Sequence, residues 1–397
     1  MQPRRHRRDE GRRDALLSRR VHRHRVLRRA SRQRRRPQDL PGLQARRGRA
    51  EGAEGGAAAR RAGLRRRRRR RRGFCGVAGR RRRRLRHRLG ALRAGHDGRT
   101  GRSPRRGPRR RVGQERAMTA AIFSDTLCTL GEGPLWHPER GQLFWFDILG
   151  KRLLTRDAAG ERRWDFTECV SAAGWVDRDR LLIASETALL LFDVETGARE
   201  TVVALEADNP ATRSNDGRAD PQGGFWIGAM GFKAEPGAGA IYRFFRGELR
   251  RIVDRVTIPN AICFAPDGRS ACYTDTPTGR ILRQPLDPAG WPTGDPSVFL
   301  DLSREDFGPD GAVIDAEGCL WNAQWGAGRV ARYAPDGRLL SAWPVPTPQA
   351  SCPAFGGPDL TTLFVTTAAE GGLAPPAGMT FRIETGVTGQ REHRVRL

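Results

Sequence analysis

One structural unit recurs six times in the second and larger part of this chain: a polar turn followed by a short apolar strand. Successive copies start about 40 to 50 residues apart, the spacing expected of a repeat that folds as one supersecondary unit. The strands that follow the turns begin at Gln142, Arg180, Gly224, Arg269, Cys319 and Leu360. Six such copies predict repetition of one small sheet about an axis.

A second pair of strands follows each copy, which predicts four strands per repeat. The pairs are 152–155 with 163–166, 188–192 with 200–203, 240–244 with 250–253, 280–283 with 297–300, and 329–333 with 341–344, and a shorter segment near Met379 takes this place in the sixth copy. The connections are Asp-Gly, Pro-Asp-Gly or Glu-Thr-Gly, which are hairpin turns, and apolar stripes with helical spacing are absent. The sequence therefore predicts an all-β, six-bladed β-propeller. The segment around Ile122 is expected to complete the last blade and close the ring.

Residues 1–117 have a composition that cannot build a core. They contain 45 arginines, no lysine and eight acidic residues, a net charge of +37, with an unbroken run of arginines from Arg65 to Arg72. Aromatic and β-branched residues are scarce, so we expect this Arg-rich segment to be disordered. The absence of lysine favours translation of a GC-rich sequence upstream of the true start, with Met118 as the natural first residue. A genuine basic tail and a targeting segment are the alternatives.

Residues 118–397 are predicted to form one propeller domain. The net charge of this domain is opposite in sign to that of the Arg-rich segment 1–117. This part carries 28 basic and 36 acidic side chains, a net charge of −8, so we expect no nucleic acid to bind the propeller. No apolar run is long enough to span a membrane. Its six cysteines are widely spaced and show no zinc-binding pattern, which favours reduced thiols and a cytoplasmic protein. We expect a monomer or a small homo-oligomer.

Four segments near blade starts carry polar residues that a turn does not require. They are Gly131-Glu132-Gly133-Pro134, Arg213-Ser214-Asn215-Asp216-Gly217, Ile258-Pro259-Asn260-Ala261-Ile262 and Gly308-Pro309-Asp310-Gly311. In a propeller the inner strand ends and their loops converge on one mouth of the central channel. Glu132, Asn260 and Asp310 offer only oxygen atoms, which suits one divalent cation such as Ca²⁺, Mg²⁺ or Mn²⁺, with Zn²⁺ or Fe²⁺ as further candidates.

These four segments resemble the GEGP, RxNDG, (S/P)N(G/A) and PDG motifs of the gluconolactonase/regucalcin (senescence marker protein) family. The order and blade spacing agree, and the resemblance extends over nearly all of residues 128–390. A single motif is weak, because Pro-Asp-Gly also occurs as a plain turn at Pro266 and Pro335. Four motifs on a sixfold repeat are specific.

The resemblance implies a role for five residues. By matching the family's motifs, Glu132, Asn260 and Asp310 are expected to be metal ligands, and Asp310 is also expected to be the general base. Arg213 and Asn215 match residues that hold the substrate. The implied reaction is metal-dependent hydrolysis of a sugar (aldono-) lactone to the aldonic acid. This chemistry needs a cation that polarises the carbonyl and a base for the attacking water, and the ordinary aspartate pKa of about 3.9 leaves Asp310 ionised at neutral pH.

The chain departs from the family pattern after Met230. Animal members carry a pair of glutamates shortly after the matching methionine, and one of them touches the substrate. Here the stretch is Gly231-Phe232-Lys233-Ala234-Glu235. We therefore expect a pocket specificity different from that of the animal enzymes.

Several of these polar residues also have a structural interpretation. Asp216 and Asp310 both precede glycine and could close Asx turns; we favour that role for Asp216 and the ligand role for Asp310. Asn260 could satisfy a buried backbone group instead of a cation. His137 is interpreted as part of a turn, and Asp275 is the best additional candidate for a pocket contact. The tryptophans inside the repeats are expected to be packing residues: Trp145, Trp226 and Trp321.

Three hypotheses for function follow, and the leading one is a sugar lactonase. A calcium-binding or regulatory propeller without significant turnover is the alternative. A nucleic-acid-binding protein that acts through the Arg-rich leader is the third. Because propellers host many activities, the site motifs and not the fold carry the first hypothesis.

Overall fold

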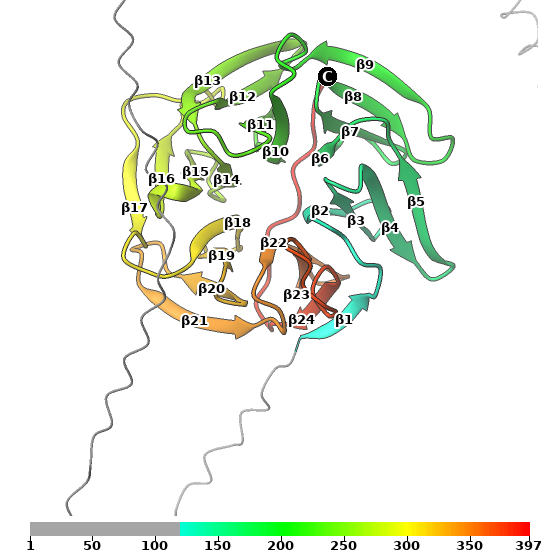
Figure 1. Cartoon of the computed structure of the whole chain (residues 1–397). Helices are drawn as coiled ribbons and strands as arrows, with labels where there is room; N and C mark the ends of the chain where they lie inside the picture. The colour runs from blue at the N-terminus through cyan, green and yellow to red at the C-terminus, as the bar shows by residue number, and fades with distance from the viewer. Residues whose placement is uncertain (1–119) are drawn as a thin grey trace, which may run out of the picture. The chain divides into compact units, whose positions relative to one another are not determined.

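The computed structural model describes residues 120–397, and they form six four-stranded antiparallel sheets arranged as blades around a central axis (Figure 1). The predicted all-β, six-bladed propeller is confirmed. The expectations for the Arg-rich segment 1–117 and for a start at Met118 lie outside the described residues. Within residues 120–397, no helix is long and apolar enough to cross a membrane.

Blades 1 to 5 each take their four strands from consecutive segments of the chain, with the innermost strand first. Blade 1 contains β2 (Gly131–His137), β3 (Gln142–Asp147), β4 (Arg152–Asp157) and β5 (Gly160–Asp165). Blade 2 contains β6 (Val170–Trp175), β7 (Arg180–Ser185), β8 (Ala188–Asp193) and β9 (Arg199–Ala204). Blade 3 contains β10 (Thr212–Ala219), β11 (Phe225–Gly231), β12 (Gly239–Phe245) and β13 (Glu248–Val256).

The second half of the ring repeats this order. Blade 4 contains β14 (Pro259–Phe264), β15 (Ser270–Asp275), β16 (Arg280–Pro285) and β17 (Ser297–Asp301), with one turn of 3-10 helix, η1 (Thr276–Thr278), after β15. Blade 5 contains β18 (Gly308–Ile314), β19 (Leu320–Trp325), β20 (Arg329–Tyr333) and β21 (Leu339–Pro344). Blade 6 contains β22 (Ala350–Gly356), β23 (Thr362–Thr367), β24 (Thr380–Glu384) and, from the start of the domain, β1 (Ala121–Ser124).

Strand β1 closes the ring, as the sequence predicted. It pairs antiparallel with β24, so Ile122 lies opposite Phe381 and the first strand of the domain becomes the outer strand of the last blade. The pairing removes the free edge that β24 would otherwise present, and it joins the two ends of the repeat.

The core is divided into six apolar clusters, and each of them lies between two neighbouring blades. Strand β3 shows how this arises, because its alternate side chains point to opposite faces. Phe144 and Phe146 pack toward blade 2, whereas Leu143 and Trp145 pack toward blade 6. Strand β3, the second strand of blade 1, is therefore apolar on both faces and lacks the apolar/polar alternation of a half-exposed sheet. The predicted packing role of Trp145, Trp226 and Trp321 is confirmed, since all three are fully buried.

The polar motifs lie within the innermost strands and not ahead of the blades. Each innermost strand carries a register shift near its beginning, at which the ladder with the second strand is interrupted: in blades 1 to 6 it follows Glu132, Val170, Ser214, Asn260, Pro309 and Ala350. Such bulges turn a side chain out of the regular alternation. The motif residues can therefore be directed at the channel while the strand stays in its sheet.

The same kind of turn, built around a buried aspartate, occurs in blade 3 and in blade 5. Asp315 accepts hydrogen bonds from the Cys319 amide and the Trp321 Nε1–H, and it pairs with Arg332. In blade 3, Asp220 likewise accepts from a turn amide and pairs with Arg243, but the indole Nε1–H of the matching Trp226 has no partner within residues 120–397.

This difference between blades gives a matched stability prediction. Trp321→Phe removes a hydrogen bond to a charged group, which typically contributes about 1.5–3 kcal/mol, whereas Trp226→Phe removes only ring area. We expect Trp321→Phe to lower the free energy of unfolding in urea by about 1–3 kcal/mol more than Trp226→Phe does. Equal losses in the two variants would contradict the assignment of this hydrogen bond.

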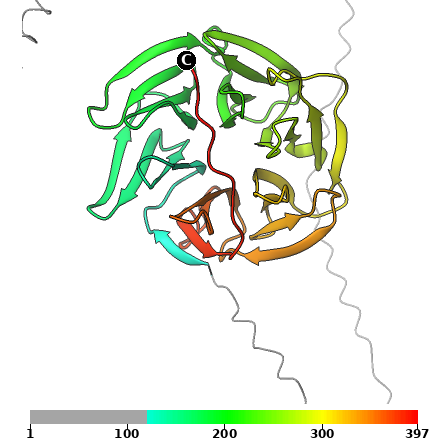
Figure 2. The ribbon, with the colours of Figure 1, turned by 180° about the vertical axis from the view of Figure 1, so that it is seen from behind.

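The C-terminal tail (residues 386–397) leaves blade 6 and runs across the ring opening toward blades 2 and 3 (Figures 1 and 2). Its contacts are with the far ends of the innermost strands. Gln390 Nε2 donates to the carbonyls of Phe264 and Ile314 at 3.0 and 2.9 Å, and Glu392 forms a partly buried ion pair with Arg218. The tail thus covers the channel at the end opposite the bulges.

Candidate functional site

A cavity of about 420 Å³ lies at the mouth of the channel where the innermost strands begin. All five residues singled out from the sequence line it: Glu132, Arg213, Asn215, Asn260 and Asp310. Their side chains are buried, with 4–6% of each residue's surface exposed. The apolar part of the wall comes from Leu130, Met230, Ile258 and Trp325. The structure therefore brings the predicted residues together, from four blades, on one cavity.

Backbone conformation directs two of these side chains. Glu132 in β2 and Asn260 in β14 each precede a residue with positive φ, Gly133 at 54° and Ala261 at 57°. At Gly133 a Cβ atom would lie 2.1 Å from the Ser171 carbonyl oxygen of the next blade, so only glycine fits there. The second glycine of the GEGP motif, Gly133, is thus needed for close packing of blades 1 and 2 next to Glu132.

Hydrogen bonds connect the amides and the guanidinium on one side of the cavity. Arg213 Nη1 donates to Asn215 Oδ1 at 2.8 Å, and Asn215 Nδ2 donates to Asn260 Oδ1 at 2.8 Å. Asn260 Nδ2 in turn donates to the hydroxyl of Thr276 at 3.0 Å. The Arg213 Nε–H is buried and has no hydrogen-bond partner within residues 120–397.

Three buried carboxyl groups, those of Glu132, Asp216 and Asp310, influence one another electrostatically at this site. Burial, and then the charge of Asp216, raise the pKa of Glu132 to about 8, and burial raises the pKa of Asp216 to about 6. Burial and the charges of Glu132 and Asp216 raise the pKa of Asp310 well above its usual range. The expectation that Asp310 has an ordinary aspartate pKa is therefore wrong for the metal-free protein. Arg213 is the cation that opposes these shifts for Glu132 and Asp310.

Asp216 belongs to this acidic group, and the turn role favoured from the sequence is wrong. Its carboxylate accepts the amide N–H of Ile262, in the innermost strand of the next blade, at 2.8 Å. The residue is buried, and its charge raises the pKa of both Glu132 and Asp310. The signal available in the sequence was its position directly after Asn215 in a motif that was already singled out.

The donor set fits a divalent cation. Two buried carboxylates and an amide oxygen, with a third carboxylate close by, supply only hard oxygen ligands, and a bound cation would relieve their mutual repulsion. A second group of potential metal ligands consists of Asp315, Glu317 and Cys319, but it does not offer a comparable set of free oxygen ligands. The Asp315 carboxylate there already accepts from backbone amides, the Trp321 indole and Arg332, so its lone pairs serve the turn.

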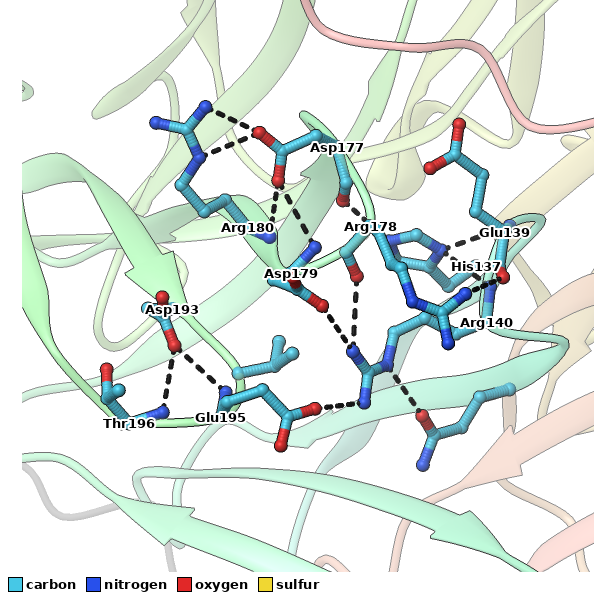
Figure 3. Close-up of polar contacts among 12 residues, drawn as sticks. His137, Glu139, Arg140, Asp177, Arg178, Asp179, Arg180, Asp193, Glu195 and Thr196 are labelled. Atoms are coloured by element: carbon cyan, nitrogen blue, oxygen red, sulfur yellow. Dashed lines mark hydrogen bonds and ion pairs between the residues drawn. The ribbon is translucent and has the colours of Figure 1, made fainter. Parts of the chain in front are cut away.

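Two other polar residues considered from the sequence have structural roles. His137 is buried at the far end of β2, where Nδ1 accepts from the amides of Glu139 and Arg140 and Nε2 donates to the Asp177 carbonyl of blade 2 (Figure 3). The turn role predicted for His137 is confirmed. Asp275, which was expected to contact the pocket, instead accepts the Ile258 amide at 2.8 Å; its neighbour Thr276 lines the cavity.

The rim of the cavity includes the segment that departs from the animal pattern. Phe232, Lys233 and Ala234 line the opening, and Phe232 and Lys233 are exposed. Glu235 is not among the lining residues, and its carboxylate accepts the backbone amide of Lys233 at 3.1 Å. An apolar ring and an ammonium group thus occupy this part of the rim, with Glu370 also at the opening.

A family model described as the SMP-30/Gluconolactonase/LRE-like region matches residues 130–369. The chain belongs to this family. The matched range contains every cavity residue named above except Glu370, whereas β1, β24 and the C-terminal tail lie outside it. The resemblance predicted from the four motifs is confirmed.

Individual members of the SMP-30/gluconolactonase/LRE-like family align with most of the described residues. A protein named "Putative sugar lactone lactonase" from Rhizobium meliloti is 41% identical over 289 residues, which cover 70% of this chain and 98% of the relative. An L-arabinolactonase from Azospirillum brasilense is 36% identical over 64% of this chain and 86% of its own length. A solved structure of a calcium-binding protein, regucalcin, from Agrobacterium tumefaciens has a TM-score of 0.69 and 40% identity, over 70% of this chain and 98% of that one.

Proposed function

We propose that this protein hydrolyses a sugar lactone, the internal ester of an aldonic acid, to the free acid in a reaction that needs one divalent cation. The observation that carries the proposal is the convergence of Glu132, Asn260 and Asp310 with Arg213 and Asn215 on one cavity. The names of relatives at 36–41% identity, a sugar lactone lactonase and an L-arabinolactonase, support a sugar lactone as the substrate.

The residues that would hold the cation are Glu132, Asn260 and Asp310. A divalent cation bound there would offset the repulsion among the buried carboxylates, polarise the lactone carbonyl and acidify the attacking water. Asp310 is proposed to accept the proton from that water and to return it to the ring oxygen when the ester bond breaks. One water is consumed, and the product is an open-chain hydroxy acid.

Arg213 and Asn215 are proposed to orient the sugar ring. The Nη1 atom of the buried Arg213 guanidinium donates hydrogen bonds to Asn215 Oδ1 and to the Ser214 carbonyl, and these bonds hold the guanidinium in place. Its remaining donors suit ring hydroxyls and the negative charge that develops on the carbonyl oxygen. The apolar wall formed by Met230, Ile258 and Trp325 limits water near the reacting carbon.

A lactone and metal panel tests this proposal. We expect protein treated with a chelator to have no lactonase activity above the spontaneous rate, and one or more of Ca²⁺, Mg²⁺, Mn²⁺, Zn²⁺ and Fe²⁺ to restore it. Glucono-, L-arabino-, galactono- and xylono-lactones would be compared by acid release with a pH indicator, in parallel with buffer containing the same metal. Full activity of the metal-free protein, or no activity with any pair, would contradict the proposal.

A calcium-binding propeller without turnover is the second candidate, because a 40%-identical structure is described as a calcium-binding protein. The same panel separates the two. Stoichiometric Ca²⁺ binding without hydrolysis of any lactone under any metal would favour the second candidate.

A further inference from the structure

Four polar side chains at the cavity form one continuous chain of hydrogen bonds across three blades. Arg213 Nη1 donates to Asn215 Oδ1 at 2.8 Å, Asn215 Nδ2 to Asn260 Oδ1 at 2.8 Å, and Asn260 Nδ2 to Thr276 Oγ1 at 3.0 Å. The Thr276 hydroxyl then donates to the carbonyl oxygen of Pro309 at 2.9 Å. This series of hydrogen bonds begins at Arg213 in blade 3 and ends at Pro309 in blade 5, one residue before Asp310.

The two ends of this chain fix the direction of every bond in it. A guanidinium can only donate, and a backbone carbonyl can only accept. The single proton of the Thr276 hydroxyl is used toward Pro309, so the hydroxyl must accept from Asn260, and the NH₂ group of that amide must face Thr276. The carbonyl oxygen of Asn260 therefore faces the other way, toward Asn215 and the cavity.

This orientation decides whether Asn260 can be a ligand. Its Oδ1 has two lone pairs, and one of them accepts from Asn215, so the second remains for a cation. With the amide reversed, Asn260 would present its NH₂ group to the cavity, and an NH₂ group does not bind metal ions. Asn215 and Thr276 hold the amide from both sides against that reversal.

Thr276 also ties together the two strands that carry these ligand candidates. Its amide donates to the Ile258 carbonyl just before β14 at 3.0 Å, while its hydroxyl reaches Pro309 in β18. The packing is close, since a Cβ atom on Gly308 would lie 2.9 Å from the Thr276 methyl group. Thr276 thus fixes the position of Asn260 relative to Asp310.

We propose that Thr276 is a positioning residue of the cation site, which holds the Asn260 carbonyl oxygen toward the cavity and fixes its place beside Asp310. The proposal rests on the proposed metal-dependent function. Residues that orient metal ligands typically change metal affinity by about 10- to 100-fold when they are replaced.

The test is the affinity of metal-stripped full-length protein for Mn²⁺, measured by isothermal titration calorimetry. We expect Thr276→Val, which keeps the branched shape and loses the hydroxyl, to raise the Kd at least about 10-fold. Thr276→Ser restores the hydroxyl and is expected to stay within about twofold of wild type, because it can rebuild the same bonds. The matched control is Thr274→Val: Thr274 lies opposite Asn260 in the β14–β15 ladder, but its hydroxyl donates to the backbone carbonyl of Arg280 at 2.7 Å and not to the side chain of a ligand candidate.

Lactonase assays at rising Mn²⁺ provide a second readout. Thr276→Val is expected to need more Mn²⁺ for half-maximal activity and to approach the wild-type kcat at saturation, since Asp310 and Arg213 are intact. A Thr276→Val protein that binds Mn²⁺ as wild type does would overturn the proposal, as would an equal loss in Thr274→Val. Wild-type protein that binds Mn²⁺ but hydrolyses no lactone would instead contradict the proposed activity, and the Kd comparison would still decide the role of Thr276.

Discussion

Replacing Asp310 by asparagine is expected to lower kcat/KM for the preferred lactone by about 10³-fold or more. The substitution keeps the size of the side chain but removes the proposed base, whose contribution is typically 10²- to 10⁴-fold, and it weakens the proposed cation site. The measurement is acid release under saturating metal, with the wild-type protein and the spontaneous rate as references. A kcat/KM within tenfold of the wild-type value would contradict the proposed role of Asp310.

A measurement of thermal stability distinguishes a loss of catalysis in Asp310→Asn from unfolding of the variant. Asp310 lies among buried carboxylates of the same charge, so Asp310→Asn is expected to leave the melting temperature of the metal-free protein unchanged or higher. Asp275→Asn is the matched control, because Asp275, at the end of β15, accepts the backbone amide of Ile258, and an asparagine side chain can still accept that hydrogen bond. We expect that variant to retain lactonase activity within a few-fold.

The metal-free protein is expected to lose stability as the pH rises from about 5 to 8. The pKa of Glu132 is raised from 4.5 to about 8 in the folded protein, and that of Asp216 from 3.8 to about 6. Between these values the folded chain binds more protons than the unfolded chain, so the free energy of unfolding falls with rising pH. Each unit of pKa difference corresponds to about 1.4 kcal/mol, and we expect a fall in Tm of about 5–10 °C.

Calorimetry of chelator-treated protein at pH 5, 6, 7 and 8 measures this fall. A divalent cation added at pH 8 is expected to reverse most of it, because the cation stabilises the ionised carboxylates. Glu132→Gln has no group to ionise and is expected to show a smaller fall and a smaller effect of metal. If the wild-type Tm does not decline over this range, or Glu132→Gln declines equally, the assignment of the acidic group is wrong.

The repeat was visible in the sequence because its second strands are the most apolar ones. Strand β3 coincides with the predicted segment starting at Gln142, since a turn directly precedes an apolar run that packs against two neighbouring blades. Ring closure by β1 could also be predicted, because six repeats left one outer strand missing and one unassigned segment near Ile122. Local turn chemistry and long-range closure pointed to the same fold.

The innermost strands were harder to predict because their composition is that of turns. Glycine, proline, asparagine and aspartate dominate the segments around Glu132 and Asp310, and these residues normally end strands. Here they form bulges inside a sheet that is buried on both sides, so the motif residues line one cavity as expected, whereas their predicted place ahead of the strands was wrong. Asp216 and Thr276 were missed for another reason: their roles depend on partners in the next blade, Ile262 and Pro309, which the linear sequence does not place nearby.

The C-terminal tail makes the proposed active site a blind-ended pocket. With Gln390 hydrogen-bonded to two innermost strands and Glu392 paired to Arg218, the far end of the channel is covered. We therefore expect a lactone that enters the proposed site beside Phe232 to leave as its acid by the same opening. The departing acid would carry its new negative charge past the exposed Lys233 ammonium at the rim, so we expect Lys233 to influence product release.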